Sequence, residues 1–154
     1  MEICYFSTEH AEEDKLLSAI NTVFPRKQIK TFSDTDKLKD ELELHIGSGT
    51  VAVLVALTEE ALLDIYCIHH VFYSISTILI LPENDECFQA LANRMKPNFL
   101  FYADSKEEDI VSVIAEITGK TRKMSTIHAR RVHNGIGNLE TALPRYLEHN
   151  VANL

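Results

Sequence analysis

Apolar and polar residues form blocks along the first 119 positions, and the spacing of the apolar residues changes from block to block. Short apolar runs have the length of buried strands, and the segments between them repeat apolar residues at helical spacing. Strands are expected at residues 2–6, 28–32, 50–57, 76–81 and 99–103. Helices are expected at 9–24, 34–46, 58–73, 82–96 and 105–118.

Several polar residues stand where the predicted helices begin. Ser33 or Asp34, then Thr58, and then Ser105 can each accept a hydrogen bond from the first backbone N–H groups of a helix. Gly119 suits the end of the last helix of this series, because glycine adopts the left-handed conformation found there. The boundaries therefore agree with five strand–helix units.

The third predicted strand is apolar at every position from Val51 to Leu57. A strand that is apolar on both faces is typical of the centre of a parallel sheet covered by helices on both sides. Helical crossovers between the strands also require parallel pairing. The pattern therefore predicts an α/β fold, a three-layer α/β/α sandwich with a five-stranded parallel sheet.

Charge divides the 154 residues into two parts. Residues 1–119 hold 9 Lys and Arg against 21 Asp and Glu, a net charge of −12. Residues 120–154 hold 6 Lys and Arg against 2 Asp and Glu, a net charge of +4. An acidic body is a poor match for nucleic acid, whose phosphates need positive charge. We therefore expect an α/β domain over 1–119 and a basic helical C-terminal extension over 120–154.

The three cysteines, Cys4, Cys67 and Cys87, are widely spaced and form no C-x-x-C pair, so the sequence predicts neither a disulfide framework nor a zinc-cysteine site. Cys4 and Cys67 are expected to pack in the core. No secretory signal is recognisable, and no apolar run approaches the ~20 residues of a membrane span. These observations favour a soluble protein of the cytoplasm.

Five strand–helix units in about 119 residues resemble a response-regulator receiver domain. The resemblance implies a flavodoxin-like fold with strand order 2-1-3-4-5. In active receivers an acidic pair after the first strand holds Mg²⁺, and an Asp that ends the third strand accepts the phosphoryl group. A Ser or Thr ends the fourth strand and a Lys ends the fifth.

This sequence departs from that pattern at the ends of the strands. Ser7 and Thr8 follow the first strand, with Glu9 next to them, and no Asp occurs within 50–63. The fourth and fifth strands end at Leu81-Pro82 and Tyr102-Ala103. The chain therefore resembles a pseudo-receiver that lacks the phospho-acceptor Asp, and such domains generally act by binding partners.

Two functions follow from this comparison. The first is a non-catalytic signalling or regulatory module that acts through protein–protein interaction, without a cofactor and without phosphorylation of a strand-three Asp. The alternative is a flavodoxin-like protein, or an enzyme, that binds a small molecule or a divalent metal at the carboxyl ends of the strands. The candidate residues at this rim are Ser7, Thr8, Glu9, Thr58 and Asp104.

The sequence gives less support to phosphate, nucleotide or metal binding. The segment after the first strand contains no glycine and is acidic, so it would repel a phosphate, and no dinucleotide or P-loop motif is present. Asp34 and Glu59 could join the rim carboxylates around a cation, but carboxylates are also favoured at helix N-termini by the helix dipole. The seven histidines, His45 among them, are expected to be ordinary surface or half-buried residues.

The C-terminal extension has its own pattern. A basic stretch through Ala129 is compatible with a sixth helix, and apolar residues after a glycine-containing break favour a last amphipathic helix. The extension could fold back on the acidic body, exchange between two subunits to make a homodimer, or dock a protein partner. Nucleic acid is not an expected partner. The candidate partner-binding residues are Arg122, Lys123, Arg130, Arg131, Leu143, Tyr146 and Leu147.

Overall fold

The computed structural model describes residues 1–8, 14–82, 85–119 and 130–131 of the chain. Its strands are β1 Ile3–Phe6, β2 Ile29–Phe32, β3 Val51–Val55, β4 Ser76–Leu81, β5 Phe99–Tyr102 and β6 Arg130–Arg131. Its α-helices are α1 Lys15–Val23, α2 Thr35–Leu44, α3 Glu59–Cys67, α4 Glu86–Met95 and α5 Glu107–Ile117. Two 3₁₀ helices are η1 Arg26–Gln28 and η2 His69–Ser74.

The strands form one sheet in the order β2-β1-β3-β4-β5-β6. The first five are mutually parallel, with Cys4 of β1 opposite both Lys30 of β2 and Ala52 of β3. The predicted parallel sheet and its order are therefore confirmed. None of the helices in the described part of the chain has the length and apolar character that a bilayer-spanning helix needs.

The short strand β6 adds a strand that the sequence did not predict. Arg130 and Arg131 pair antiparallel with Leu100 and Phe99 of β5, whereas residues 120–129, on which the predicted sixth helix falls, lie outside the described residues. A sheet edge offers unpaired backbone groups, and a segment brought beside it pairs with them whatever its own helical preference. The other residues of the extension, and with them the predicted last helix, lie outside the described residues.

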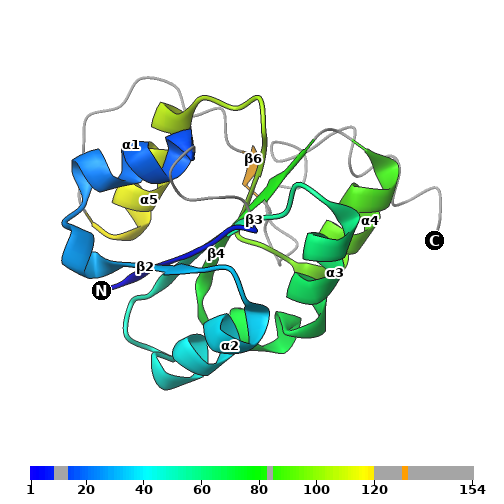
Figure 1. The fold of residues 1–154 in the computed structure, drawn as a ribbon, viewed down its shortest axis with the longest axis horizontal. Helices are drawn as coiled ribbons and strands as arrows, with labels where there is room; N and C mark the ends of the chain where they lie inside the picture. The colour runs from blue at the N-terminus through cyan, green and yellow to red at the C-terminus, as the bar shows by residue number, and fades with distance from the viewer. Residues whose placement is uncertain (9–13, 83–84, 120–129, 132–154) are drawn as a thin grey trace.

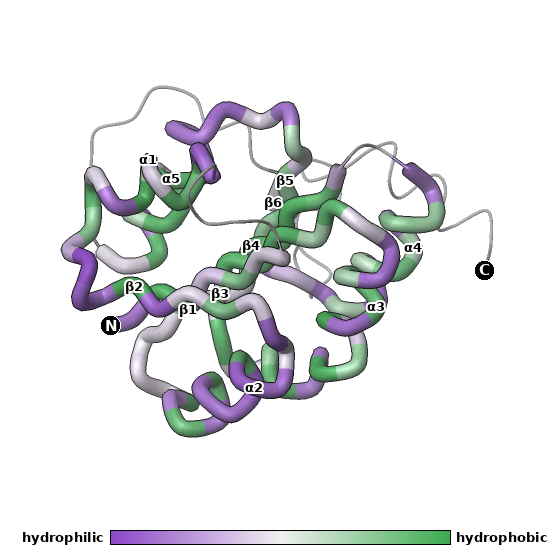
Figure 2. Tube along the Cα trace, in the orientation of Figure 1, coloured by the Kyte–Doolittle hydropathy of each residue, from purple (hydrophilic) through white to green (hydrophobic). Residues whose placement is uncertain are grey.

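Helices cover the two faces of the sheet unequally. Helices α1 and α5 lie on one face, and α2, α3 and α4 lie on the other (Figure 1). The central strand β3 is buried along its whole length, because apolar side chains of both layers pack against it. In Figure 2 the strands at the centre are mainly hydrophobic, and the helices around them alternate hydrophobic and hydrophilic positions. The predicted three-layer sandwich is therefore confirmed.

Two of the predicted helix caps are confirmed. Asp34 accepts a hydrogen bond from the backbone N–H of Asp36 at 2.8 Å, and Thr58 accepts one from Ala61 at 3.1 Å. Helix α5 is different, because its N-cap residue is Lys106 and no side chain caps it. The prediction for Ser105 was wrong, since its hydroxyl oxygen instead accepts from the N–H of Tyr102 within the turn that follows β5 (3.1 Å).

The third predicted helix is shorter than its pattern indicated. Helix α3 ends at Cys67, and the tighter helix η2 continues the segment to Ser74. The prediction that Cys67 packs in the core was wrong, because its side chain is exposed at the end of α3. The second predicted helix was expected to reach residue 46, but α2 ends at Leu44 and Ile46 is 57% exposed.

Candidate functional site

The carboxyl ends of the parallel strands carry small or apolar side chains. Ser7 follows β1 and is buried, with its N–H bonded to the carbonyl oxygen of Phe32 at 3.0 Å. Ala56 follows β3, is fully buried, and donates its N–H to Ile80 at 2.9 Å. Ala103 follows β5 and donates its N–H to the carbonyl oxygen of Leu81 at 2.8 Å. These backbone groups extend the sheet by one residue beyond each strand.

The structure places the predicted rim residues in unlike environments. Thr8 and Asp104 are exposed, and the hydroxyl of Thr58 is used to cap α3. Glu9 lies outside the described residues. Among the residues that the structure describes, no three imidazole, thiol or carboxylate groups of this rim come close enough to share a metal ion.

A cleft of about 230 Å³ opens at this same edge, between the N-terminal ends of α1 and α5. Side chains of β1, β3 and β4 line it together with apolar and polar residues at the start of the two helices. The hydroxyl of Tyr5 donates to Asp14 inside the cleft, so both groups are already paired. The cleft is smaller than the ~300–1,000 Å³ of typical ligand pockets. Its lining includes Tyr5, Val55, Ile80, Asp14, Lys15 and Glu107.

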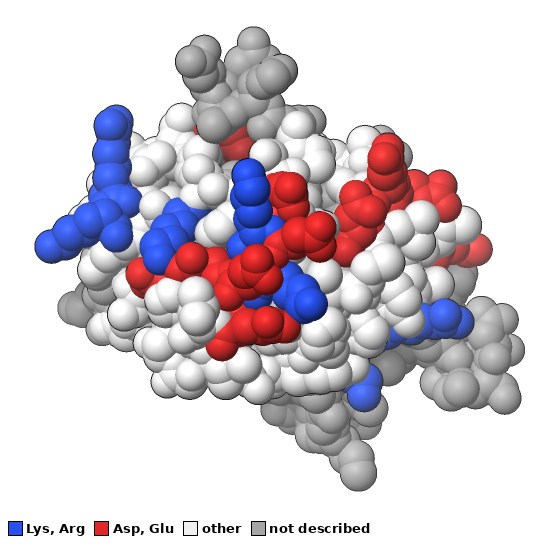
Figure 3. All heavy atoms as spheres, turned by 60° about the horizontal axis from the view of Figure 1, so that its bottom comes forward, with Lys and Arg blue, Asp and Glu red and all other residues white. Residues whose placement is uncertain are grey.

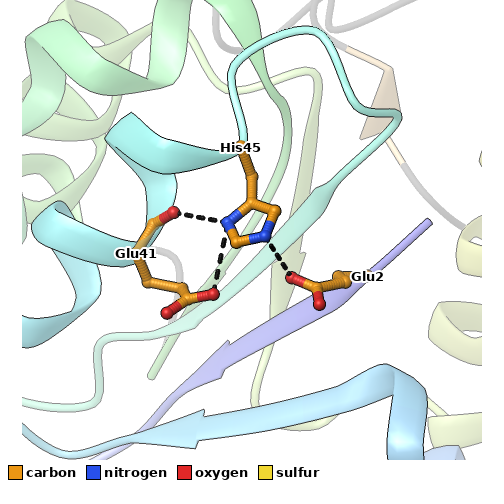
Figure 4. A group of neighbouring side chains, drawn as sticks. All are labelled: Glu2, Glu41 and His45. Carbon is orange, nitrogen blue, oxygen red and sulfur yellow. Dashed lines mark hydrogen bonds and ion pairs between the residues drawn. The ribbon is translucent and has the colours of Figure 1, made fainter.

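A second polar group lies at the opposite edge of the sheet, where the strands begin. It consists of Glu2 before β1, Lys30 in β2, and Glu41 and His45 at the end of α2; we call it the Glu2–Lys30–Glu41–His45 cluster. Lys30 forms ion pairs with Glu41 and with Oε1 of Glu2, the latter at 3.3 Å. The imidazole of His45 lies between the two carboxylates (Figure 4). Three elements therefore meet in one ionic group.

The ring of His45 is held by α2 itself. Its Nδ1 lies 2.8 Å from the carbonyl oxygen of Glu41 and 3.2 Å from Oε1 of the same residue, and its Nε2 lies 3.2 Å from Oε2 of Glu2. A carbonyl oxygen only accepts, so Nδ1 carries the proton. Nε2 of the neutral ring is then an acceptor that faces the Glu2 carboxylate.

The cluster shifts the pKa of two neighbouring groups. The hydrogen bond with Glu41 raises the pKa of the Lys30 ammonium, because the carboxylate stabilises the charged form. Burial, and then the negative charges of Glu2 and Glu41, raise the pKa of the Cys4 thiol to about 12. Cys4 is therefore a neutral core residue and not a reactive thiol.

Charged residues of both signs surround this cluster on the α2 side of the molecule. Figure 3 brings that side forward and shows acidic and basic side chains intermingled over it. One such pair joins Lys39 and Glu43 at 3.8 Å. Exposed pairs of this kind contribute little to stability. In the Glu2–Lys30–Glu41–His45 cluster, the side chains of Glu2, Glu41 and His45 are 20–27% exposed, less than the 36% and 46% of Lys39 and Glu43, whereas Lys30 is 39% exposed.

Sequence reasoning missed this cluster. The only sequence signal is the spacing of Glu41 and His45, which places both side chains on one face of a helix. Glu2 and Lys30 join them through the pairing of β1 with β2, in which Cys4 stands opposite Lys30. Strand register cannot be read from two isolated polar residues, so no pattern in the chain indicated the group.

Comparison with known proteins gives matches in structure alone. No family of known proteins and no curated protein matches the sequence. A CheY-like response regulator receiver domain protein from Methanospirillum hungatei superposes with a TM-score of 0.59 at 8% identity, covering 77% of this chain and 94% of that one. The chain has a receiver-like fold.

Two further structures superpose on the chain, one of them a receiver domain. The signal receiver domain of NarL from Mycobacterium tuberculosis superposes with a TM-score of 0.56 at 10% identity, covering 78% of this chain and 97% of that chain. The N-terminal domain of an uncharacterized protein from Wolinella succinogenes superposes with a TM-score of 0.59 at 11% identity, covering 78% of this chain and 94% of that chain. The predicted resemblance to receiver domains is confirmed for the fold. At such low identities the likeness carries no residue roles.

Proposed function

We propose that this protein is a pseudo-receiver, a non-catalytic signalling or regulatory module that acts by binding a protein partner. The observation that carries the proposal is the buried Ala56 directly after β3, at the edge where a receiver would present its phospho-acceptor. A methyl group can neither accept a phosphoryl group nor ligate Mg²⁺. Ala103 stands after β5, where a lysine would neutralise the phosphoryl oxygens.

The surface of the described residues favours one helical layer for the protein contact. Apart from Met1, the large apolar side chains that the structure exposes all lie on the side of α2 and α3: Leu44, Ile46, Leu63 and Tyr73. Leu44 is 79% exposed and Tyr73 62%. Contiguous apolar patches mark contact surfaces, so the layer that holds these four exposed residues is the one that we propose for the contact.

The C-terminal extension is proposed as a further docking element. Its backbone joins the sheet at Arg130–Arg131, beside β5, so the extension has a fixed point of attachment to the body. From there it could hold a protein partner, or a second copy of the chain as a homodimer. The proposed division into a body of residues 1–119 and an extension of residues 120–154 follows the change of charge.

Phosphoryl transfer tests the non-catalytic part of this proposal. The full-length protein would be incubated with acetyl phosphate and Mg²⁺ and analysed by intact mass, with an active receiver domain treated in parallel. The expected result is an unchanged mass for this protein and a phosphorylated control. Addition of a phosphoryl group to any Asp or Glu of this chain would overturn the proposal.

Affinity capture from the host's lysate tests the partner-binding part. Three full-length baits would be compared: the unchanged protein, a Leu44→Ser/Tyr73→Ser variant, and a variant with alanine at Arg122, Lys123, Arg130 and Arg131. A protein lost from the second bait would place the contact on the α2–α3 layer, and one lost from the third would place it on the extension. Identical patterns from all three baits would contradict both placements.

The cleft at the carboxyl ends of the strands favours a second candidate function, the binding of a small molecule. Its apolar inner surface and the paired Tyr5 and Asp14 could hold a ligand of a few atoms. A thermal-shift screen with small organic molecules and divalent cations tests this function. A shift that is abolished by Lys15→Ala or Glu107→Gln, at two residues that line the cleft, would favour it over the pseudo-receiver.

A further inference from the structure

The Glu2–Lys30–Glu41–His45 cluster holds more negative than positive charge. When His45 is neutral, two carboxylates face the single ammonium of Lys30, which leaves a net charge of −1. Oε2 of Glu2 is buried, and it lies 3.2 Å from Nε2 of His45, which carries no proton in the neutral ring. Two such acceptors repel each other, so this position calls for a positive charge between them.

The orientation of His45 is the one that metal-binding histidines adopt. Such a histidine donates one ring N–H to a carbonyl or carboxylate, which fixes the tautomer and leaves the other nitrogen free to ligate. Here Nδ1 donates to the carbonyl oxygen of Glu41 at 2.8 Å. Nε2 is consequently the nitrogen left to ligate, and it lies 3.2 Å from Oε2 of Glu2 (Figure 4).

The spacing of these two atoms fits a shared metal ion. Bonds of about 2.0–2.1 Å at a tetrahedral zinc place neighbouring ligand atoms about 3.3 Å apart. Nε2 of His45 and Oε2 of Glu2 are 3.2 Å apart. Each of Glu2, Glu41 and His45 offers a ligand atom within 4.8 Å of the others. Imidazole and carboxylate groups are both zinc ligands, and three protein ligands are the number found at zinc sites that keep a position open.

We propose that Glu2, Glu41 and His45 bind a divalent transition-metal ion of the zinc class at the beginning of the sheet. The ligands come from α2 and from the residue before β1, so the ion would join these two elements. Their side chains are 20–27% exposed, which allows an ion to enter from solvent. The site lies at the opposite edge from the strand-end positions, and the proposal is independent of the pseudo-receiver function.

Lys30 is the competitor within the site. Its ammonium forms ion pairs with Oε1 of Glu2 and Oε1 of Glu41, whereas it makes no ion pair with Oε2 of Glu2, the oxygen that we assign to the metal. The ammonium repels an incoming dication and engages the Glu41 oxygen. Removing the charge of Lys30 should therefore tighten metal binding. If the cluster were only a surface ion pair, the same change would create no metal site.

Zinc titration of the full-length protein by calorimetry at pH 7.5 tests the proposal. We expect one Zn²⁺ to bind the unchanged protein and to raise its melting temperature, as mass action requires for a ligand of the folded state. His45→Gln and Glu2→Gln should each weaken binding at least about 10-fold, the scale of losses at metal sites. Lys30→Met should bind Zn²⁺ more tightly than the unchanged protein.

His69→Gln is the matched control. His69 is also half-buried, and its Nδ1 likewise meets a backbone carbonyl, that of Tyr66, at 2.6 Å. Its ring packs against Tyr66 and Tyr73 and not between carboxylates. Zinc affinity should stay within twofold of the unchanged protein. Circular dichroism would verify the fold of each variant, and Glu2→Gln provides the ligand test should His45→Gln misfold.

Two results would overturn the proposal. One is the absence of any zinc binding below 1 mM by the unchanged, folded protein. The other is equal zinc affinity in the unchanged protein and in the folded His45→Gln and Glu2→Gln variants, which would place the ion elsewhere in the chain. Neither result bears on the phosphoryl-transfer test, so failure of this site and failure of the pseudo-receiver function are distinguishable.

Discussion

Tyr5 in β1 donates its hydroxyl proton to Oδ2 of Asp14, the residue that caps α1. The other carboxylate oxygen of Asp14 accepts from the backbone N–H of Leu17 at 3.0 Å. One side chain therefore both begins the helix and joins it to the sheet. This arrangement positions α1 at the edge of the cleft near the carboxyl ends of the strands.

Replacing Asp14 tests both of its hydrogen bonds. Asp14→Ala removes the cap, worth about 1 kcal/mol, and the charged hydrogen bond to Tyr5, worth about 1.5–3 kcal/mol. We expect a loss of about 2–4 kcal/mol in the free energy of unfolding, measured by urea denaturation. Asp14→Asn keeps a capping oxygen and should lose less than half as much. Equal losses in the two variants would contradict the capping role.

The buried central strand provides a second prediction. Leu54 in β3 is fully buried, so Leu54→Ala should lower the free energy of unfolding by about 2–5 kcal/mol through lost packing and a cavity. Leu44→Ala is the matched control, because Leu44 is exposed and should change stability by less than about 0.5 kcal/mol. Urea denaturation monitored by circular dichroism measures both. A similar loss at the two positions would be inconsistent with the sandwich core.

Thiol labelling should separate the three cysteines. Cys67 and Cys87 are exposed, whereas Cys4 is buried and has its pKa raised to about 12. Iodoacetamide reacts with the thiolate, so at pH 8.5 the folded protein should take up label at Cys67 and Cys87 and not at Cys4. Peptide mass spectrometry before and after denaturation reads this out. Fast labelling of Cys4 in the folded state would contradict its burial.

The same raised pKa predicts a loss of stability at alkaline pH. Between pH 9 and about 12 the Cys4 thiol keeps its proton in the folded state and loses it in the unfolded state. Stability from this group is therefore fully present below pH 9 and falls as the pH rises toward 12. Cys4→Ala should show a shallower decline between pH 9 and 10.5. The raised pKa of Lys30 acts with the same sign, and this contribution remains in the variant.

Proline substitution tests the pairing of β6 with β5. Proline has no N–H to donate, so Arg130→Pro and Arg131→Pro together should break the ladder to Phe99 and Leu100. Amide hydrogen exchange in a peptide that covers 99–102 should accelerate about fivefold, corresponding to the loss of a hydrogen bond worth about 1 kcal/mol. A double alanine variant at the same positions keeps both donors and serves as the control. Unchanged exchange in the proline variant would argue against β6.

Much of the fold was predictable because its determinants are local. β3 is apolar at every position, and such a run can only be buried on both faces. Asp34 and Thr58 begin α2 and α3 because their side chains reach backbone N–H groups two or three residues away. The prediction for Ser105 failed because its hydroxyl had a second local partner, the N–H of Tyr102. Sequence alone does not rank two such partners.

The candidate sites depended on contacts between distant parts of the chain. The sequence by itself determined the parallel sandwich and the small or apolar residues at the carboxyl ends of its strands. Only the tertiary structure decided that Arg130–Arg131 would add a strand to β5, and that Glu2 and Lys30 would meet Glu41 and His45. Strand pairing joins residues far apart in the chain through backbone groups that every residue carries. The side chains at such meeting points therefore leave no periodic pattern in the sequence.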